Sequence, residues 1–364
     1  MGLRCGIVGL PNVGKSTLFN CLSSAKAEAA NYPFCTIEPN VGVITVPDER
    51  IYNLAELIKP QKIVPTVIEF VDIAGLVKGA SRGEGLGNKF LANIREVDAI
   101  IHVVRCFEDE NVAHVGGKID PVADKEILET ELQLKDLESI DRRIQKTEKI
   151  ANSGDAKAKK EMAVLEKAKL HLEAGKSIRS LQLGPLDVQI LKNELQLLTA
   201  KPEIYVANVD ENALEGNDYV NQLKDSIPDE NREIITLSAS LESQIVELDD
   251  EDKLMFLSEY GLRESGMNKL IRASYHILDL ITFFTGGEKE VRAWTIRKGS
   301  KAPQAAGLIH SDFERGFIRA EVIKYVDYVF YKSEHACKEA GKMFIEGKEY
   351  VVKDGDVMFF RFNV

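Results

Sequence analysis

Short apolar runs separated by longer mixed stretches mark the first hundred residues and return after residue 200. The runs at residues 5–8, 66–71 and 99–104 are rich in β-branched side chains, as are those at 203–207 and 234–237. Continuous apolar runs of this length are typical of strands buried in a parallel sheet. We therefore expect an α/β fold with a mostly parallel central sheet.

Between residues 124 and 201 the pattern becomes helical. Lys, Glu, Leu and Ala dominate this segment, and Asn-Ser-Gly-Asp at 152–155 interrupts it. Apolar residues recur at three-, four- or seven-residue spacing on both sides of the break, which is enough to seal two helices together. They are Leu137, Ile140 and Ile144 on one arm and Met162, Leu165 and Leu172 on the other. The segment predicts an antiparallel helical hairpin inserted between two strands.

The last part of the chain, residues 278–364, alternates apolar and polar residues in short runs. These runs lie at 291–296, 318–322, 350–352 and 357–362, with breaks at Gly286-Gly287 and Asp354-Gly355. They predict a small mixed sheet with one helix. No catalytic constellation is visible in it, so we expect a binding module.

The strongest chemical signal follows the first strand, where residues 9–16 have the form G-x-x-x-x-G-K-S. Glycines at both ends let the backbone bend around a polyphosphate, Lys15 reaches its terminal phosphates, and Ser16 offers a hydroxyl to Mg²⁺. This pattern between a strand and a helix predicts a P-loop nucleotide triphosphate site. The expected phosphate-binding residues are Asn12, Val13, Gly14, Lys15, Ser16 and Thr17.

Motifs further along favour a molecular switch over a kinase or motor. Asp72 follows the strand at 66–71 and should hold Mg²⁺ through water. Thr36 is expected to be a second ligand of Mg²⁺ and of the γ-phosphate. The backbone N–H of Gly75 could approach the γ-phosphate closely and sense its loss. Ser16, Thr36 and Asp72 form the expected metal site.

The base-recognition motif is altered. A guanine-specific switch carries N-K-x-D after this strand, whereas Asn208 is followed here by Val209, Asp210 and Glu211. Adenine has no 2-amino group and a lone pair where guanine has a proton, so a carboxylate gains nothing from it. We expect relaxed guanine selectivity, with ATP preferred. Ser238 and Ala239 should supply the last loop beside the base.

The catalytic position is altered as well. Leu76 stands where many switch GTPases place the glutamine that orients the attacking water, so hydrolysis should be slow. Asn12 could help to coordinate K⁺ beside the phosphates. His114 is another candidate, although a solvated loop histidine is the commoner case. The expected catalytic set is Lys15, Thr36, Gly75 and His114; His102, inside an apolar strand, is most simply a core residue.

Four segments together resemble the Obg-related family of P-loop NTPases, which are switches related to translation factors. They are residues 9–20, 72–88, the altered motif at 208–211, and 353–364. The resemblance implies an ATPase with weaker GTP use, a hydrophobic residue in place of the catalytic glutamine, and a helical insertion. It also implies a C-terminal TGS domain of the β-grasp type, association with ribosomes and a role in stress responses.

The domain layout follows from these segments. We expect a P-loop nucleotide-binding (G) domain at 1–123 and 202–277, the helical hairpin at 124–201 and the TGS domain at 278–364. A chain of 364 residues with 44% hydrophobic content can bury more than one core.

Charge limits the expected partners. A net charge of −11 argues against indiscriminate coating of nucleic acid. Lys157, Lys159 and Lys160 near the hairpin tip form a local basic excess that is either RNA-facing or a solvated helical surface. Basic residues also surround Trp294, which is either a stacking residue or part of a core. We expect ATP as the ligand and the ribosome, both RNA and protein, as partner through the hairpin and the TGS domain.

Cysteine usage and hydropathy indicate the compartment. The five cysteines contain no C-x-x-C pair, and no run of about 18 apolar residues is present. We expect a cytoplasmic monomer with no membrane partner and no structural zinc. Cys35, beside Thr36, is either a redox-sensitive position or a small apolar filler.

Two other functions remain open. Because Leu76 makes hydrolysis slow, the chain could be a nucleotide-sensing adaptor that binds protein partners and hydrolyses nucleotide only incidentally. A small-molecule P-loop kinase ranks lower, because no acceptor pocket or Arg-rich lid is evident.

Overall fold

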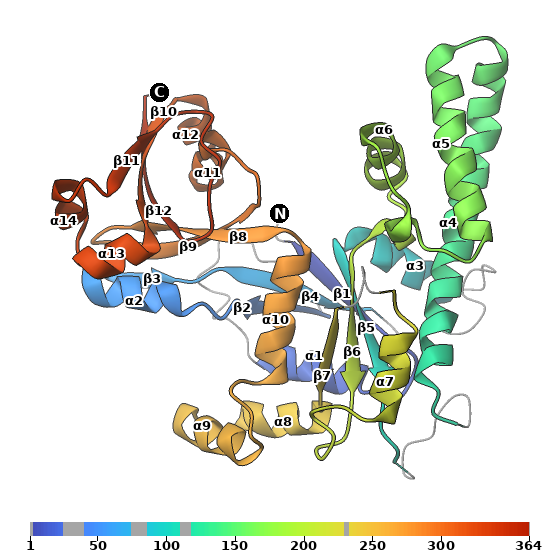
Figure 1. The fold of residues 1–364 in the computed structure, drawn as a ribbon, viewed down its shortest axis with the longest axis horizontal. Coiled ribbons are helices and arrows are strands. Elements are labelled where there is room, and N and C mark those ends of the chain that lie inside the picture. Colours follow the sequence, from blue (N-terminus) through green and yellow to red (C-terminus); the bar gives the residue numbers. More distant parts are fainter. Residues whose placement is uncertain (1–2, 25–39, 74–85, 110–117, 229–232, 364) are drawn as a thin grey trace. The chain divides into compact units, whose positions relative to one another are not determined.

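The structure is a computed structural model, and it describes residues 3–24, 40–73, 86–109, 118–228 and 233–363 (Figure 1). Within these, the chain divides into two compact units. The first contains residues 3–24, 40–42 and 69–270, and the second contains residues 43–68 and 271–363. In the described part, no helix is long and apolar enough to cross a membrane.

The first unit is built on a six-stranded sheet in the order β2-β4-β1-β5-β6-β7. The strands are β1 (Arg4–Val8), β2 (Val41–Thr45), β4 (Val67–Asp72), β5 (Ala99–Arg105), β6 (Glu203–Asn208) and β7 (Ile234–Leu237). The pairs from β4 through β7 are all parallel. All five strands predicted from apolar runs are confirmed to within a residue, and so is the α/β fold.

Strand register brings the predicted motifs to one edge of this sheet. Ile7, just before the glycine-rich loop, pairs with Asp72, and Asn208 pairs with both Arg105 and Leu237. Because the strands are parallel, their carboxyl ends meet at the same edge, where ligands bind in open α/β sheets.

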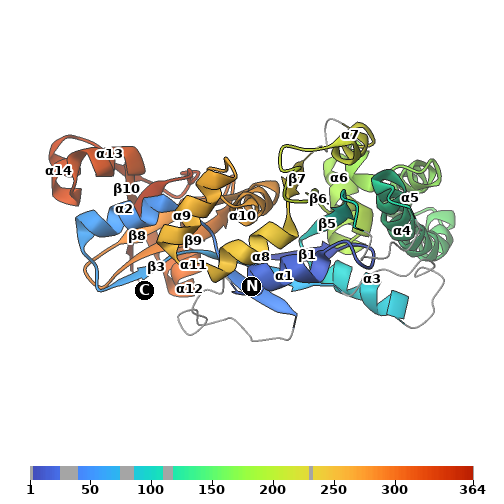
Figure 2. The same ribbon diagram turned by 90° about the horizontal axis from the view of Figure 1, so that it is seen from below.

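Helices of the first unit include α1 (Lys15–Ser24), α3 (Leu86–Glu96), α7 (Asp218–Asp225), α8 (Ala239–Glu247) and α9 (Asp250–Glu259). Helix α10 (Gly266–Ile277) crosses the division between the units. Helices α1 and α8 pack side by side (Figure 2). The loops that open these two helices are therefore neighbours.

The inserted helical hairpin consists of α4 (Pro121–Asn152) and α5 (Ala156–Glu173), which run side by side (Figure 1). Asp120 and Asp155 cap their N-termini, accepting hydrogen bonds from Ala123 N (3.0 Å) and Ala158 N (2.6 Å). Of the predicted apolar stripe, Ile140, Leu165 and Leu172 are buried and Leu137 and Ile144 half-buried. The predicted hairpin is confirmed.

The hairpin ends earlier than the helical composition suggested. Gly175, with φ +72°, ends the helical arm, and Pro185 starts a new turn. Short turns follow: η3 (Ile178–Ser180), α6 (Pro185–Asp187), η4 (Val188–Glu194) and η5 (Leu198–Ala200). Their apolar side chains, including Ile178 and Leu191, pack into the hairpin core. Composition alone could not separate this folded-back segment from the second helix.

The second unit carries a mixed sheet in the order β11-β10-β12-β8-β9-β3. Its strands are β3 (Lys62–Val64), β8 (Leu280–Gly286), β9 (Glu290–Arg297), β10 (Phe317–Lys324), β11 (Met343–Glu346) and β12 (Asp356–Phe362). Strand β12 is parallel to β8, whereas the pairs β8–β9, β10–β12 and β10–β11 are antiparallel. A first hairpin beside a central last strand is the β-grasp arrangement, as expected.

Three features of this unit differ from the prediction. Residues 350–352 form only an isolated bridge, between Val351 and Lys301. Residues 278–363, for which one helix was predicted, contain four: α11 (Ala302–Ile309), α12 (Ser311–Arg315), α13 (Tyr325–Tyr331) and α14 (Glu334–Glu339). Finally, α2 (Glu49–Ile58) and β3 come from the N-terminal third of the chain yet fold with this unit, because Ile51 and Leu54 are buried in its core.

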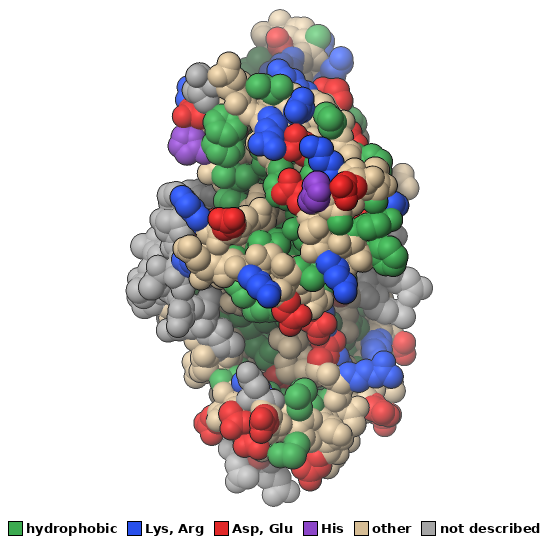
Figure 3. Space-filling view, turned by 90° about the vertical axis from the view of Figure 1, so that its left-hand side faces the viewer, with side chains coloured by type: hydrophobic (Ala, Val, Ile, Leu, Met, Phe, Trp, Pro, Cys, Tyr) green, Lys and Arg blue, Asp and Glu red, His purple; other side chains and the backbone are tan. Residues whose placement is uncertain are grey.

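Trp294 packs against a separate apolar cluster of the second unit, which includes Phe283 and Ile296. It is half-buried and stacked on Phe283, and its indole N–H donates to Thr285 Oγ1 at 2.9 Å. The Arg292 guanidinium lies 4.1 Å from the indole ring centroid. The face shown in Figure 3 mixes acidic, basic and apolar side chains rather than presenting charge of one sign.

Candidate functional site

The glycine-rich loop between β1 and α1 needs special backbone geometry at two positions. Asn12 has φ +64° and Gly14 has φ +92°, both in the left-handed region. A Cβ atom added at Gly14 would lie 2.2 Å from Asn208 Nδ2. Gly14 is therefore required twice, by its backbone angle and by the close approach of Asn208. The loop then passes directly into the first turn of α1, where Ser16 and Thr17 are exposed.

Asn208 holds two loops of the site together. Its buried side-chain amide donates from Nδ2 to the carbonyl of Val13 (2.9 Å), and its Oδ1 accepts from the backbone N–H of Ala239 (2.9 Å). The phosphate-binding loop and the start of α8 are thus tied to the end of β6. Sequence reasoning placed Asn208 beside the base but did not foresee this positioning role.

Lys15 and Asp72 form an ion pair at the carboxyl edge of the sheet. Their side chains are 11% and 21% exposed, so both groups are reached by solvent. Lys15 opens α1 and Asp72 closes β4, and the parallel pairing of β1 with β4 brings them together. A phosphate placed at the start of α1 would meet the Lys15 ammonium and the free N–H groups of that helix.

Val209 and Glu211, both expected beside the base, differ from each other in burial. Val209 is 2% exposed and packs into a core cluster with Val104 and Val220. Glu211 is half-buried, and its Oε1 accepts hydrogen bonds from Ser240 Oγ (2.9 Å) and Gln244 Nε2 (3.0 Å).

Ser238 and Ala239 form the start of α8. Ser238 is buried, and its hydroxyl caps the helix by accepting from Leu241 N at 3.4 Å. Ala239 contributes the N–H that Asn208 accepts. The structure therefore brings both residues to the same edge as the glycine-rich loop.

The oxygen atoms of Ser16 and Asp72 fit Mg²⁺, which takes one or two protein oxygens together with waters and substrate phosphates. The described residues hold no cluster of three His, Cys, Asp or Glu side chains that could bind a metal by themselves. Thr36, Gly75 and His114 lie outside the described residues, as do Leu76 and Cys35.

A second polar cluster, not predicted as a unit, lies where the hairpin meets the sheet. We call His102, Arg179, Glu203 and Tyr205 the buried cluster. Arg179 forms an ion pair with Glu203, and His102 Nδ1 lies 3.5 Å from Glu203 Oε1. The Tyr205 hydroxyl lies 3.0 Å from Glu203 Oε2 and 2.8 Å from Glu129 Oε1.

Burial controls the protonation of this cluster. It lowers the pKa of His102 to about 4, so the imidazole is neutral at pH 7. It also raises the pKa of Tyr205, which keeps the phenol protonated. The simple expectation that His102 is a core residue agrees with its 1% exposure. The cluster joins β5, β6 and η3, and Glu129 extends it to α4.

Two family models match the chain. Residues 4–167 match the MMR_HSR1 model, described as a 50S ribosome-binding GTPase. Residues 280–363 match the YchF-GTPase_C model, described as a protein of unknown function (DUF933).

Curated proteins named "Ribosome-binding ATPase YchF" resemble the chain over its whole length. Those from Haemophilus influenzae and Escherichia coli O157:H7 are each 56% identical over 364 residues, with 100% of both chains covered. The one from Bacillus subtilis is 55% identical over 367 residues, again with full coverage.

Solved structures of other proteins also resemble the chain. The YchF GTPase of Schizosaccharomyces pombe is 42% identical, has a TM-score of 0.89, and covers 99% of this chain and 98% of its own. A GTP-binding protein from Pyrococcus horikoshii, 19% identical with a TM-score of 0.57, shares the fold. The motif-based resemblance is thus confirmed over the full length, and the chain belongs to the YchF family of P-loop NTPases.

Proposed function

We propose that the chain is a Mg²⁺-dependent molecular switch that binds ATP, hydrolyses it slowly and associates with the ribosome. The observation that carries this proposal is the double hydrogen bond of Asn208, which organises the phosphate-binding loop and the α8 loop around one edge of the sheet. The names of full-length relatives at 55% and 56% identity support the ATPase activity and the ribosomal partner.

Phosphate binding would proceed by exchange of ion-pair partners. In the structure the Lys15 ammonium contacts Asp72. An incoming triphosphate would offer Lys15 a more highly charged partner, and the backbone N–H groups of residues 13–17 would donate hydrogen bonds to the same phosphates. Lys15 then leaves Asp72, and the Asp72 carboxylate becomes free to accept hydrogen bonds from water bound to Mg²⁺.

Ser16, Asp72 and Thr36 would hold the magnesium ion, Asp72 through water. When bound, Mg²⁺ neutralises charge that builds up on the transferred phosphoryl oxygens. Asn12, at the left-handed corner of the loop, is proposed to contribute to a K⁺ site beside the phosphates. Thr36, Gly75 and His114 keep their proposed roles in catalysis and γ-phosphate sensing.

The surroundings of Glu211 support a preference for ATP. A carboxylate that reads guanine must accept from the ring N–H and the exocyclic amine, which uses both of its oxygens. Glu211 Oε1 already accepts from Ser240 and Gln244. Guanine would have to displace these donors, whereas adenine makes no such demand. GTP should therefore bind less well.

A GTPase is the second candidate, because the Schizosaccharomyces pombe relative is called a GTPase. The two functions differ in one measurable quantity, the ratio of the affinities for ATP and GTP. That ratio is independent of the ribosomal partner.

Ribosome association would use the hairpin and the β-grasp unit. Lys157, Lys159 and Lys160 are exposed in the first turn of α5, next to the tip, where phosphates of ribosomal RNA could reach them. Other basic residues of the hairpin, such as Arg143 and Lys169, are in ion pairs with acids. A cytoplasmic, monomeric protein is part of this proposal.

Ribosome pelleting with ATP or ADP tests the switch. We expect the ATP-bound form to differ from the ADP-bound form by at least about fivefold in ribosome affinity. Replacing Lys157, Lys159 and Lys160 together by Gln should lower the ribosome affinity of both the ATP-bound and the ADP-bound form. The ratio of the two affinities should not increase. Equal affinity of the wild type with ATP and ADP would contradict the switch.

A further inference from the structure

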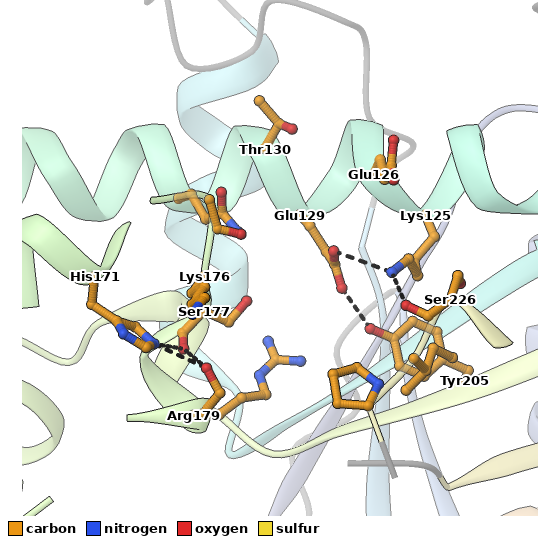
Figure 4. A pocket seen from close by; sticks show the side chains of 15 residues that line it. Lys125, Glu126, Glu129, Thr130, His171, Lys176, Ser177, Arg179, Tyr205 and Ser226 are labelled. Carbon is orange, nitrogen blue, oxygen red and sulfur yellow. Dashed lines mark hydrogen bonds and ion pairs between the residues drawn. The ribbon is translucent and has the colours of Figure 1, made fainter. Parts of the chain in front are cut away.

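A cavity of about 570 Å³ lies at the base of the helical hairpin, inside the first unit (Figure 4). Its walls come from the first turns of α4, the last turn of α5 and the segment after it, β6, and the segment after α7. This hairpin-base cavity is separate from the glycine-rich loop, none of whose residues line it. Its volume lies within the range of small-molecule sites.

Helix α4 contributes one polar face to the hairpin-base cavity. Lys125, Glu129 and Gln133 follow one another at intervals of four residues and so share a face. Lys125 Nζ donates to the carbonyl of Ser226 (3.0 Å) and lies 3.5 Å from Glu129 Oε2. Gln133 Nε2 donates to the carbonyl of Gly175 (3.2 Å). An ammonium has three donors and an amide two, so both groups can make further hydrogen bonds.

Arg179 approaches the cavity from the opposite wall. Its Nε donates to the carbonyl of Thr199 (3.2 Å), and Glu203 pairs with Nη1. Its Nη2 is buried and has no hydrogen-bond partner among the described residues. Figure 4 shows the guanidinium pointing into the space between His171 and Tyr205. Because water does not reach Nη2, an acceptor in the cavity would bond to it only after the guanidinium turns, and this bond would remove the cost of leaving the donor unpaired.

The remaining hydrogen-bonding capacity of the walls favours an anion. Lys125, Lys176 and Arg179 bring three cations, and Glu126, Glu129 and Glu203, which pairs with Arg179 from behind the wall, bring three acids, so the unused donors rather than net charge decide. Both Glu129 oxygens are engaged, Oε1 by the Tyr205 hydroxyl and Oε2 by Lys125. The cations come from different elements, which suits a group with several acceptor oxygens, such as phosphate.

The rest of the cavity would hold an organic portion with hydroxyl groups. A bare phosphate is much smaller than the cavity. Thr130, Gln133 and Ser177 place hydroxyl and amide groups on the walls. His171 adds no further cation at neutral pH, because burial lowers its pKa; its Nε2 lies 2.9 Å from Ser180 Oγ.

We propose that the hairpin-base cavity binds a small phosphorylated sugar or nucleoside, with its phosphate between Arg179 and Lys125. Such a ligand would join α4, η3 and β6 and so fix the hairpin on the sheet. The proposal does not depend on the ATPase function, because the cavity shares no residue with the nucleotide site.

Calorimetric titration of the full-length protein with ribose 5-phosphate tests this proposal. We expect saturable binding of ribose 5-phosphate and none of ribose at the same concentrations. Excess ADP with Mg²⁺ should leave the binding unchanged. No saturable binding would overturn the proposal, and so would displacement by ADP, which would place the ligand in the glycine-rich loop.

Variants locate the binding. Arg179→Gln should weaken ribose 5-phosphate binding by at least about tenfold, since a charged hydrogen-bond donor is lost. Lys167→Gln makes the same charge change at a lysine that pairs with Asp187 outside the cavity, and should bind like the wild type. Unchanged binding by folded Arg179→Gln would contradict the assignment.

A second variant keeps the test decisive if Arg179→Gln does not fold. Ser177→Trp adds bulk to the cavity wall and leaves the Arg179–Glu203 pair in place, so it should also abolish binding. Normal binding by this variant would overturn the proposal. A short RNA oligonucleotide that displaced ribose 5-phosphate would also contradict it, because the phosphate would then belong to RNA.

Discussion

Two ion pairs in the first unit differ sharply in their surroundings. Lys15 and Asp72 meet at the open edge of the sheet, with side chains 11% and 21% exposed. Arg179 and Glu203 meet beneath the hairpin; the Arg179 side chain is 11% exposed, like that of Lys15, but Glu203 is only 1% exposed, and His102 and Tyr205 lie against it. Both pairs join a basic residue to a carboxylate, yet only the first can exchange its partner for a ligand without unfolding its neighbourhood.

The difference is one of desolvation. A partly solvated pair gains little from its own attraction, so a triphosphate can replace the carboxylate. A buried pair has already lost its hydration, and removing one member leaves the other charged and unpaired. We infer that the Lys15–Asp72 pair separates when nucleotide binds, whereas the Arg179–Glu203 pair stays in place and fixes the hairpin to β6, leaving only the other Arg179 donor for the proposed cavity ligand.

The largest effect is expected at the buried pair. Glu203→Ala should lower the free energy of unfolding by about 3 kcal/mol, because the largely buried Arg179 guanidinium loses its partner. ATP affinity of the folded fraction should not change. Chemical denaturation and calorimetry measure the two quantities. Glu138→Ala is the control, since its exposed pairs with Lys135 and Arg142 should be worth about 0–1 kcal/mol. A loss no larger than that of the control would remove the contrast.

At the Lys15–Asp72 pair, a substitution should lower nucleotide affinity rather than stability. Lys15→Ala should weaken ATP–Mg²⁺ binding by at least about 100-fold, close to 3 kcal/mol, since a charge-assisted contact to phosphate is lost. Stability without nucleotide should change by less than about 1 kcal/mol. Lys149→Ala, an exposed hairpin lysine, should bind ATP normally. If Lys15→Ala instead lost mainly stability, the pair would be structural.

Replacing Asn208 should lower both the stability of the protein and its affinity for ATP. Asn208→Ala leaves the buried carbonyl of Val13 and the N–H of Ala239 without their partner, which should cost about 2 kcal/mol of stability. ATP affinity should also fall, because the glycine-rich loop loses its support. Asn208→Asp keeps an acceptor for Ala239 N but turns a buried carboxylate oxygen towards the carbonyl oxygen of Val13, so its stability loss in thermal unfolding should be at least as large as that of Asn208→Ala. A clearly smaller loss would argue against the bond from Asn208 to Val13.

The pH dependence of stability tests the buried cluster with a smaller effect. The pKa of His102 is lowered from 6.5 to about 4 in the folded state, so the unfolded chain binds the proton between these values. Stability from this group should therefore be lost as pH falls, by about 1.5 kcal/mol between pH 6.5 and about 5.

The matched comparison for that measurement is His102→Gln. Burial raises the pKa of Asp136 to about 6, which gives the opposite slope in the same pH range. Asp136 is present in both proteins, so the difference between wild type and His102→Gln isolates His102. As the pH is lowered, the free energy of unfolding of His102→Gln should rise relative to that of the wild type. Parallel pH curves would show that His102 is not held neutral by burial.

The same contrast explains what the sequence could predict. The glycine-rich loop and the carboxylate after β4 are local patterns with fixed spacing, so the positions of Lys15 and Asp72 followed from the motif and from parallel strands. The members of the buried cluster lie up to about a hundred residues apart, on separate elements. No local spacing marks them, and only the tertiary fold brings Arg179 to Glu203.

The ends of helices and their packing partners were harder to predict from the sequence than the presence of the helices and strands. Strands with continuous apolar runs were located to within a residue, because burial on both faces leaves a strong signal. The helical arm after residue 173 and the placement of α2 with the second sheet depend on packing partners elsewhere in the chain. The role of Val209 is a similar case, since its place in the core is set by Val104 and Val220 rather than by the base motif.

The most direct test of the account is the affinity of the wild type and of Glu211→Asp for ATP and GTP analogues with Mg²⁺, measured by calorimetry. Glu211→Asp shortens the side chain that Ser240 and Gln244 hold, and Val209 is left in place because a lysine there would enter the core. We expect the wild type to bind the ATP analogue more tightly, and the variant to shift towards GTP by a few-fold. Tighter binding of the GTP analogue by the wild type would contradict the proposed ATPase and assign the chain to guanine-specific switches.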